Sequence, residues 1–216
     1  MLRLHGVRLR QLYDLQLITQ IGAVYIQDGG GMVVKVEDPM NILRYLHPEC
    51  IVLDLQPQLS EADPDETPER AERRAIADKE RVVQELAEIF DRSGVIANPT
   101  KFHKDLLHRE RKATTAIAPG IAIPHVRSRQ VKSFVMGFAR AQGGGVPFAS
   151  LDGSPTRLFF LLASPSYDNE GIYDRLYLKV YRQFAEMLQH DWVIDSFLEA
   201  EDEQAIYDIL RGYISQ

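Results

Sequence analysis

The alternation of apolar and polar positions predicts strands and amphipathic helices in turn along most of the chain. The run from Leu158 to Ala163 is apolar at every position, which predicts a strand buried on both faces. Further strand-like runs cover 51–55 and 133–141, and a fourth ends at Pro124. Helical spacing recurs at 39–46, 78–93, 98–109, 172–189, 192–200 and 203–213. This order predicts an α/β fold in which one mixed β-sheet is flanked by helices on both faces.

Capping signals mark the ends of several predicted helices. Asp38 and Asn98 each precede a proline, a pair typical of an N-cap followed by the first helical turn. Asp78 is the expected N-cap of the helix that includes Phe90, and Gly94 follows as its stop signal.

Residues 57–77 form a charged insert within this pattern. They are rich in Pro, Glu, Asp and Arg and hold almost no apolar residue before Ile76. Such a composition buries too little apolar surface to offset the entropy of ordering. We therefore expect a solvated insert that is either partly disordered or a frayed extension of the following helix.

The first 37 residues predict an appended unit, distinct from a main domain at 38–216. Apolar positions from Leu9 to Leu17 are spaced as in a short amphipathic helix. Two β-rich runs then flank the Asp-Gly-Gly-Gly sequence at 28–31, which predicts a β-hairpin. Because the edges of a hairpin carry unpaired backbone donors, residues 1–37 are a candidate surface for homo-oligomer contacts.

Composition narrows the class of protein. The 216 residues carry 25 Lys and Arg against 31 Asp and Glu, and the net charge of −6 argues against a broad nucleic-acid surface. No apolar run approaches the roughly 20 residues of a membrane-spanning helix, and the N-terminus lacks a signal-peptide core. The single Cys50, beside three apolar residues, is expected to be a small buried hydrophobe. Together these features predict a cytoplasmic protein with no membrane span and no nucleic-acid partner.

The segment Gly120–His125 is the strongest candidate for chemistry. Proline cannot donate a ladder hydrogen bond, so we expect the strand to stop at Pro124 and to place His125 at the rim of the sheet. An imidazole with an ordinary pKa near 6.5 is largely neutral at neutral pH and has one ring nitrogen free to attack. The residues alone leave two interpretations open, an exposed nucleophile or a plain turn histidine. His103 and His108 are five residues apart, which is not a metal-binding spacing on one helix face.

A longer pattern surrounds His125. Upstream are Arg109-Glu110 and Thr114-Thr115, and downstream are Phe148, Asp152-Gly153, Pro155, the apolar run 158–163 and Pro165. In this order and spacing the chain resembles the enzyme IIA domain of the bacterial sugar phosphotransferase system, of the fructose/mannitol type. The resemblance covers about 39–216 apart from the insert. Since no IIB or membrane IIC domain accompanies it, the chain looks closest to the nitrogen-regulatory branch.

The resemblance implies a three-layer fold and a phosphohistidine carrier without a cofactor or metal. In the family, the histidine that matches His125 accepts a phosphoryl group from an HPr-type phosphocarrier. It then passes the group to a IIB domain or keeps it as a regulatory mark for a target protein. Arg109 matches the active-site arginine, whose planar guanidinium can hold phosphate oxygens. Thr114 and Thr115 either offer hydroxyls to the phosphate or cap the turn. Glu110 either orients Arg109 or points to solvent.

Two departures from the family pattern bear on activity. The family's second histidine, on the helix after the buried strand, is matched here by Tyr177. A tyrosine can donate one hydrogen bond but supplies no cationic imidazolium. The family's glycine-rich loop is matched by 113–120, which has lost three glycines and gained a proline. The sequence therefore leaves two functions open: a carrier with Arg109 and His125 in one shallow pocket, edged by Thr115 and Tyr177, or a regulatory binding module of the same fold with weak or lost phosphotransfer.

Overall fold

The structure, a computed structural model, divides the chain into two units, Met1–Ile42 and Leu43–Gln216, which are described separately. It describes residues 3–4, 7–8, 23–28, 31–36, 42–148, 150, 153–167 and 171–214. Within the first unit, β1 (Arg3–Leu4) pairs antiparallel with β2 (Val7–Arg8). The strands β3 (Ala23–Asp28) and β4 (Gly31–Val36) also pair antiparallel, which confirms the predicted hairpin. The predicted helix at 9–17 and the cap at Asp38 lie outside the described residues.

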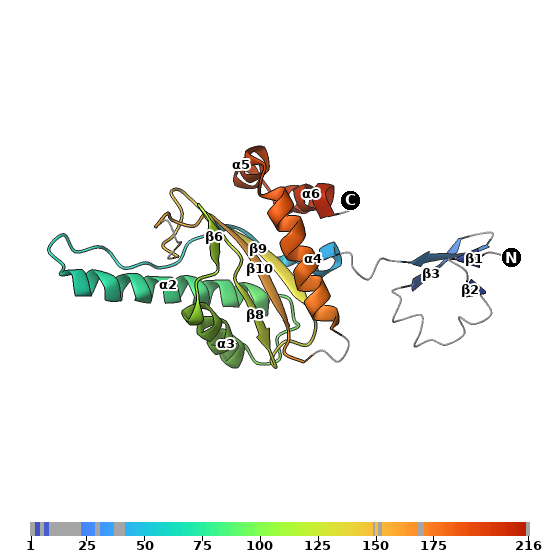
Figure 1. Cartoon of the computed structure of the whole chain (residues 1–216), viewed down its shortest axis with the longest axis horizontal. Coiled ribbons are helices and arrows are strands. Elements are labelled where there is room, and N and C mark those ends of the chain that lie inside the picture. Colours follow the sequence, from blue (N-terminus) through green and yellow to red (C-terminus); the bar gives the residue numbers. More distant parts are fainter. Residues whose placement is uncertain are drawn as a thin grey trace. The chain divides into compact units, whose positions relative to one another are not determined.

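The second unit is built on a six-stranded mixed sheet (Figure 1). Its strands follow the order β5-β9-β10-β7-β6, and β8 pairs with β10. The pair β9–β10 is antiparallel, whereas β10 pairs in parallel with β7 and β8, and β5 with β9. The strands are β5 (Leu46–Leu55), β6 (Ala116–Ala118), β7 (Ile121–Ala122), β8 (His125–Ser128), β9 (Val135–Ala141) and β10 (Leu158–Pro165).

Helices cover both faces of this sheet, as the sequence predicts (Figure 1). The α-helices are α2 (Pro68–Asp91), α3 (Pro99–Lys112), α4 (Ile172–Met187), α5 (Asp191–Glu199) and α6 (Glu203–Ile214). Alternate residues of β10 meet the two helical layers. Phe159 packs into the core with α2 and α3. Phe160, on the opposite face, lies 4.6 Å between ring centroids from Phe184 of α4 and 5.3 Å from Phe197 of α5. Burial of β10 on both faces is therefore confirmed.

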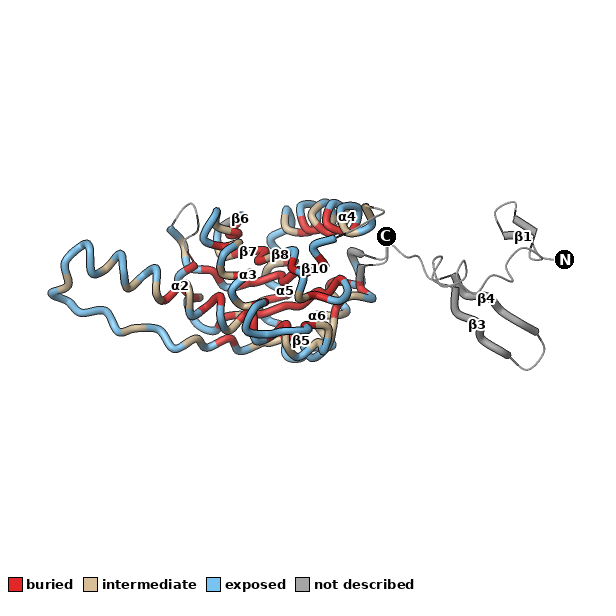
Figure 2. The backbone as a smooth tube through the Cα atoms, turned by 90° about the horizontal axis from the view of Figure 1, so that it is seen from below, coloured by how far each residue is buried: buried red, intermediate tan, exposed pale blue. Residues whose placement is uncertain are grey.

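The predicted start of α2 at Asp78 is wrong. The helix begins ten residues earlier, where the side chain of Thr67 accepts a hydrogen bond from the backbone of Arg70. Asp78 is buried inside the helix, and its carboxylate accepts hydrogen bonds from the backbone N–H of Ser60 and from Arg81. The insert thus holds a helical extension, and the segment at 56–66 lies along it as a mostly exposed arm (Figure 2).

Of the other local expectations, one is wrong and three are confirmed. Leu46 is the first residue of β5 rather than part of a helix, and a 3-10 turn (Ile42–Tyr45) directly precedes it. Gly94 has a φ of +69° beyond the end of α2, as expected of a stop signal. The Asn98 side chain accepts a hydrogen bond from the backbone of Lys101 and so caps α3. Cys50 is fully buried, and burial raises the pKa of its thiol to about 12, so its prediction as a buried hydrophobe is confirmed.

Candidate functional site

The segment that carries His125 is interrupted at Pro124, not ended there as predicted. After a turn at Gly120, with φ +75°, β7 runs over only two residues. The carbonyl of Pro124 still accepts a hydrogen bond from the backbone N–H of Leu162, at 3.0 Å. The ladder can therefore resume in β8, where His125 is paired with Leu162. Proline removes one donor but keeps its acceptor, so a parallel neighbour can bridge the gap. His125 thus lies half-buried beside the middle of β10.

Two hydrogen bonds fix the His125 ring. Its Nδ1 lies 2.8 Å from the carbonyl oxygen of Ile123, and its Nε2 lies 2.8 Å from Nη2 of Arg109. A carbonyl can only accept and a guanidinium can only donate, so the network assigns the proton to Nδ1 and the lone pair to Nε2. Burial lowers the pKa of the imidazole below 6.5, and the positive charge of Arg109 acts in the same direction. The histidine is therefore held neutral with Nε2 as its reactive atom.

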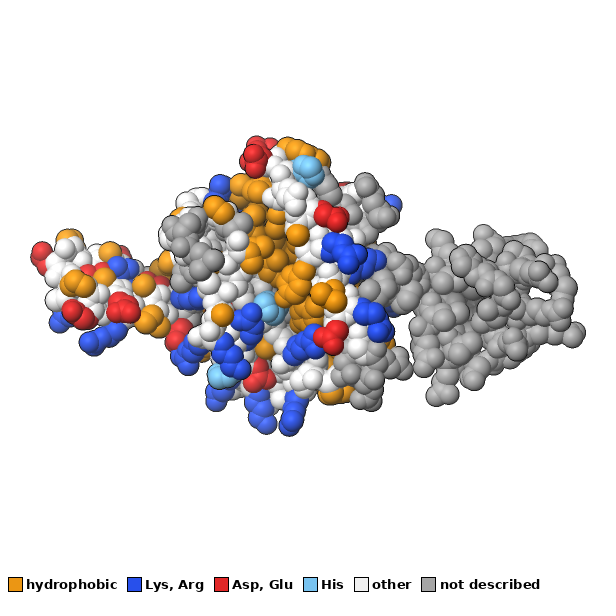
Figure 3. All heavy atoms as spheres, in the orientation of Figure 1, with side chains coloured by type: hydrophobic (Ala, Val, Ile, Leu, Met, Phe, Trp, Pro, Cys, Tyr) orange, Lys and Arg blue, Asp and Glu red, His pale blue; other side chains and the backbone are white. Residues whose placement is uncertain are grey.

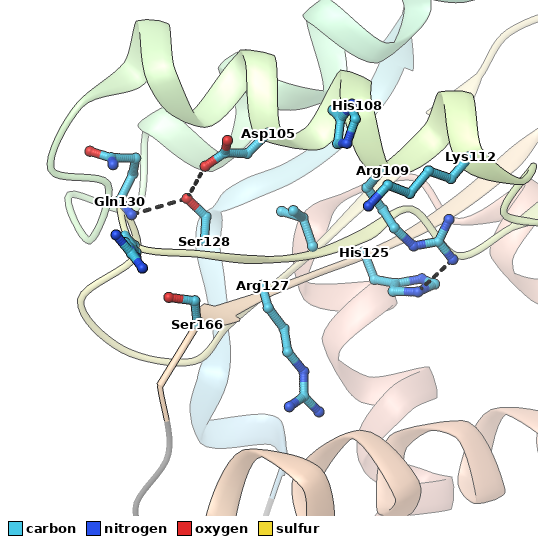
Figure 4. A pocket seen from close by; sticks show the side chains of 11 residues that line it. Asp105, His108, Arg109, Lys112, His125, Arg127, Ser128, Gln130 and Ser166 are labelled. Carbon is cyan, nitrogen blue, oxygen red and sulfur yellow. Dashed lines mark hydrogen bonds between the residues drawn. The ribbon is translucent and has the colours of Figure 1, made fainter.

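Arg109 reaches His125 from the last turn of α3. Its Nη1 donates to the carbonyl of Ala113 at 2.9 Å, which anchors the guanidinium at the helix end. The other terminal nitrogen faces the imidazole, and Figure 4 shows the two side chains pointing toward each other. The structure thus brings together the two residues that the sequence singled out.

The two threonines do not line the same pocket as His125. Thr115 is buried, and its hydroxyl donates to Oε2 of Glu110 at 2.7 Å while its backbone N–H donates to Oε1. Thr114 donates to the carbonyl of Phe148 at 3.4 Å. Glu110 neither orients Arg109 nor points to solvent, since it is buried and pairs with Lys79 at 2.7 Å. Both threonines therefore shape the loop after α3.

Two tyrosines of α4 face the imidazole. Tyr177 lies 6.2 Å from His125 between ring centroids, but it is buried and its hydroxyl donates to the carbonyl of Val126 at 3.2 Å. Tyr181, one turn further along the helix, lies 5.8 Å from His125 and is half-buried. Burial raises the pKa of the Tyr181 hydroxyl, whereas the charges of Arg109 and Arg127 lower it, so the phenol lies within the field of both guanidiniums. Sequence analysis missed Tyr181, although its spacing of four from Tyr177 places both on one helix face.

His125 lines an open pocket of about 640 Å³ (Figure 4). Sequence analysis also missed several of its basic side chains, although two periodicities could have found them. His108, Arg109 and Lys112 share one face of α3, and Arg127 and Arg129 follow His125 at alternate positions. The pocket is lined by Asp105, His108, Arg109, Lys112, His125, Val126, Arg127, Ser128, Arg129, Gln130 and Ser166.

Other kinds of site find little support in the part of the chain that the structure describes. No group of three His, Cys, Asp or Glu side chains there is placed to hold a metal ion. None of the helices there has the length and apolar character needed to cross a bilayer. His103, one of the remaining histidines, pairs with Asp91 at 2.8 Å.

Comparison with known proteins gives consistent matches. Residues 69–213 match the model of the family described as "Phosphoenolpyruvate-dependent sugar phosphotransferase system, EIIA 2". The chain is 32% identical over 136 residues to the fructose-specific EIIABC component of Bacillus subtilis, a match covering 63% of this chain but only 20% of that protein. It is 31% identical over 136 residues to a nitrogen regulatory protein of Bradyrhizobium diazoefficiens, covering 62% of this chain and 84% of that protein. The crystal structure of the nitrogen regulatory protein IIA-Ntr of Neisseria meningitidis superposes with a TM-score of 0.61 at 23% identity, covering 78% of this chain and 98% of that one, and so supports the fold.

Proposed function

Since the chain belongs to the EIIA 2 family of the phosphoenolpyruvate-dependent sugar phosphotransferase system, we propose that it carries a phosphoryl group on Nε2 of His125. One observation carries this proposal: the hydrogen bond from Nδ1 to the carbonyl of Ile123 leaves the Nε2 lone pair facing Arg109. A neutral imidazole held in this tautomer is a competent nucleophile at neutral pH.

The transfer step follows from this geometry. The Nε2 lone pair attacks the phosphorus of a donor phosphohistidine, the new N–P bond forms, and the old N–P bond breaks with its electron pair returning to the donor imidazole. The proton on Nδ1 stays in place because the Ile123 carbonyl holds it. Arg109 moves from Nε2 to the arriving phosphoryl oxygens, which its forked guanidinium can hold through two hydrogen bonds. Such positioning and charge stabilisation dominate phosphoryl transfer.

Tyr181 completes the proposed pocket. The hydroxyl of Tyr177 donates to the Val126 carbonyl and the residue is buried, so we assign this hydroxyl a structural role rather than contact with the phosphoryl group. Tyr181 is half-buried beside His125, within the field of Arg109 and Arg127, where a phosphoryl group would also lie. We assign to Tyr181 a hydrogen bond to that group, in place of the imidazole that the family usually supplies at position 177.

The proposed partners are an HPr-type phosphocarrier as donor and a IIB domain or a regulatory target as recipient. Both outcomes are compatible with the relatives, one of which is named as fructose-specific and another as nitrogen regulatory. This function would place the protein in the cytoplasm, and its single buried cysteine is compatible with a reducing compartment. The N-terminal unit remains our candidate for homo-oligomer contacts.

The test is incubation with phosphoenolpyruvate, enzyme I and HPr, followed by intact mass spectrometry. We expect a gain of about 80 Da, the mass of one phosphoryl group, in the wild type and none in His125→Ala. If the wild type gains no mass with a donor system that phosphorylates a control IIA domain, the carrier function is refuted. The alternative, a regulatory binding module of the same fold, would then take its place, favoured by the absence of a second histidine at position 177.

A further inference from the structure

We propose that the pocket beside His125 belongs to a basic docking surface that recruits an acidic protein partner. We define the basic face as the exposed pocket residues Lys112, Arg127 and Arg129, together with Arg109. The inference deepens the proposed function, since it names the chemistry of the partner surface that this site would meet.

The charge of this face runs against that of the whole chain. Residues 99–132, which supply all four side chains, hold eight Lys and Arg but only two Asp and Glu. The rest of the chain then holds 17 basic residues against 29 acidic ones, a net charge of −12. Figure 3 shows many Lys and Arg side chains gathered on one part of the face that it displays. The net charge of the protein therefore hides a local surface of opposite sign.

Much of this positive charge is unpaired. Arg127 forms an ion pair with Asp174, and the carboxylate of Asp105 accepts a hydrogen bond from Ser128. No carboxylate among the described residues forms an ion pair with Lys112 or Arg129, although both are exposed. Exposed charges of one sign around a recognition site attract a partner of opposite sign and speed its association.

The other side of the histidine is apolar, which favours a protein as the occupant. Figure 3 shows a strip of hydrophobic side chains on the same face as the gathered basic side chains, and Tyr181 of α4 packs edge-on against His125. Leu178 of α4, on the helix that carries Tyr181, is 66% exposed. A protein interface combines an apolar centre with a charged rim, whereas a nucleic-acid surface is dominated by phosphate contacts. The partner inferred here has an apolar patch next to its own phosphoryl-carrying residue and acidic side chains at one edge of that patch.

The experiment reverses two charges and measures binding and transfer separately. The test variant is Lys112→Glu/Arg129→Glu. The control is Arg70→Glu/Arg73→Glu, which makes the same change in net charge at two exposed arginines of α2 outside the pocket. The probe is the HPr-type carrier of the same organism. Its binding in the unphosphorylated form is followed by NMR shifts of the labelled protein, and its transfer by rapid quench at 50 to 500 mM NaCl.

We expect the test variant to lose about tenfold or more in association rate at 50 mM NaCl and the control less than about twofold, because steering charges act locally. The wild-type rate should fall as salt rises, while the rate of the test variant stays flat or increases. Potassium phosphoramidate, a small donor, should phosphorylate the wild type and the control variant at similar rates. Wild-type rates that rise with salt, or equal losses in test and control, would overturn the inference.

Two further outcomes separate this inference from the proposed function. If neither donor phosphorylates His125 but the carrier still binds in a salt-sensitive way that the test variant loses, the docking surface stands and the carrier function fails. If the carrier does not bind, the inference falls. Binding of a duplex DNA or of phosphatidylglycerol vesicles at 150 mM NaCl, without binding of the carrier, would reassign the basic face to that ligand.

Discussion

Replacing Tyr181 by phenylalanine tests the least expected part of the site. The change removes one oxygen and keeps the ring that packs edge-on against His125 at 5.8 Å, so it leaves no cavity beside the imidazole. A hydrogen bond to a charged group contributes about 1.5–3 kcal/mol. At about 1.4 kcal/mol per factor of ten, the phosphorylated state should be less favoured by roughly 10- to 100-fold in Tyr181→Phe.

The assay compares phosphoryl uptake by rapid quench with the hydrolysis rate of isolated phosphoprotein. Tyr177→Phe is the matched control, because its hydroxyl binds the Val126 carbonyl instead. It should lower the free energy of unfolding by about 1 kcal/mol and change uptake little. If Tyr181→Phe matches the wild type in both rates while Tyr177→Phe slows uptake, the roles assigned to the two hydroxyls are reversed and our reasoning is refuted.

Three other predictions follow from the contacts of the site. Arg109→Lys should slow uptake by roughly tenfold at unchanged stability, because an ammonium keeps the charge but loses the fork; an unchanged rate would contradict the role given to Arg109. The pKa of His125 is lower in the folded than in the unfolded protein. Phosphoryl uptake, and the contribution of His125 to the free energy of unfolding, should therefore be complete above pH 6.5 and decline only below it. An NMR titration midpoint of His125 at or above 6.5 would contradict this. Lys79→Met leaves Thr115 as the remaining partner of the buried Glu110 carboxylate among the described residues. The change should cost about 3 kcal/mol in urea unfolding, part of which Lys79→Met/Glu110→Gln should restore.

Most of the helices and strands could be predicted from the local periodicity of apolar residues. The uninterrupted apolar run of β10 predicted burial on both faces, and the caps at Gly94 and Asn98 predicted where α2 ends and α3 begins. The start of α2 could not be predicted in this way. Asp78 has the side chain of an N-cap and does accept a backbone hydrogen bond, but from Ser60 on another segment. An acceptor suited to capping does not reveal which backbone group it will meet.

The site was predictable only where its geometry is local or follows the family pattern. Arg109 and His125 were identified by their match to the family pattern, and the structure places them in contact. The buried ion pair of Glu110 was not predicted, because its partner Lys79 lies 31 residues away on α2. Tyr181 was missed because the family pattern points only to position 177, one helical turn before it. Pairings between distant elements and the exposure of individual hydroxyls depend on packing, which a single sequence does not display.

The hydrogen bond from Nδ1 of His125 to the Ile123 carbonyl has a consequence for detection. Phosphohistidine exists as two regioisomers, and here the nitrogen of one of them is already occupied by a backbone contact. A phosphorylated form of this protein should therefore contain the Nε2 isomer alone. An antibody specific for the Nε2 isomer would therefore detect all of the phosphorylated form of this protein. An antibody specific for the Nδ1 isomer would serve as the negative control.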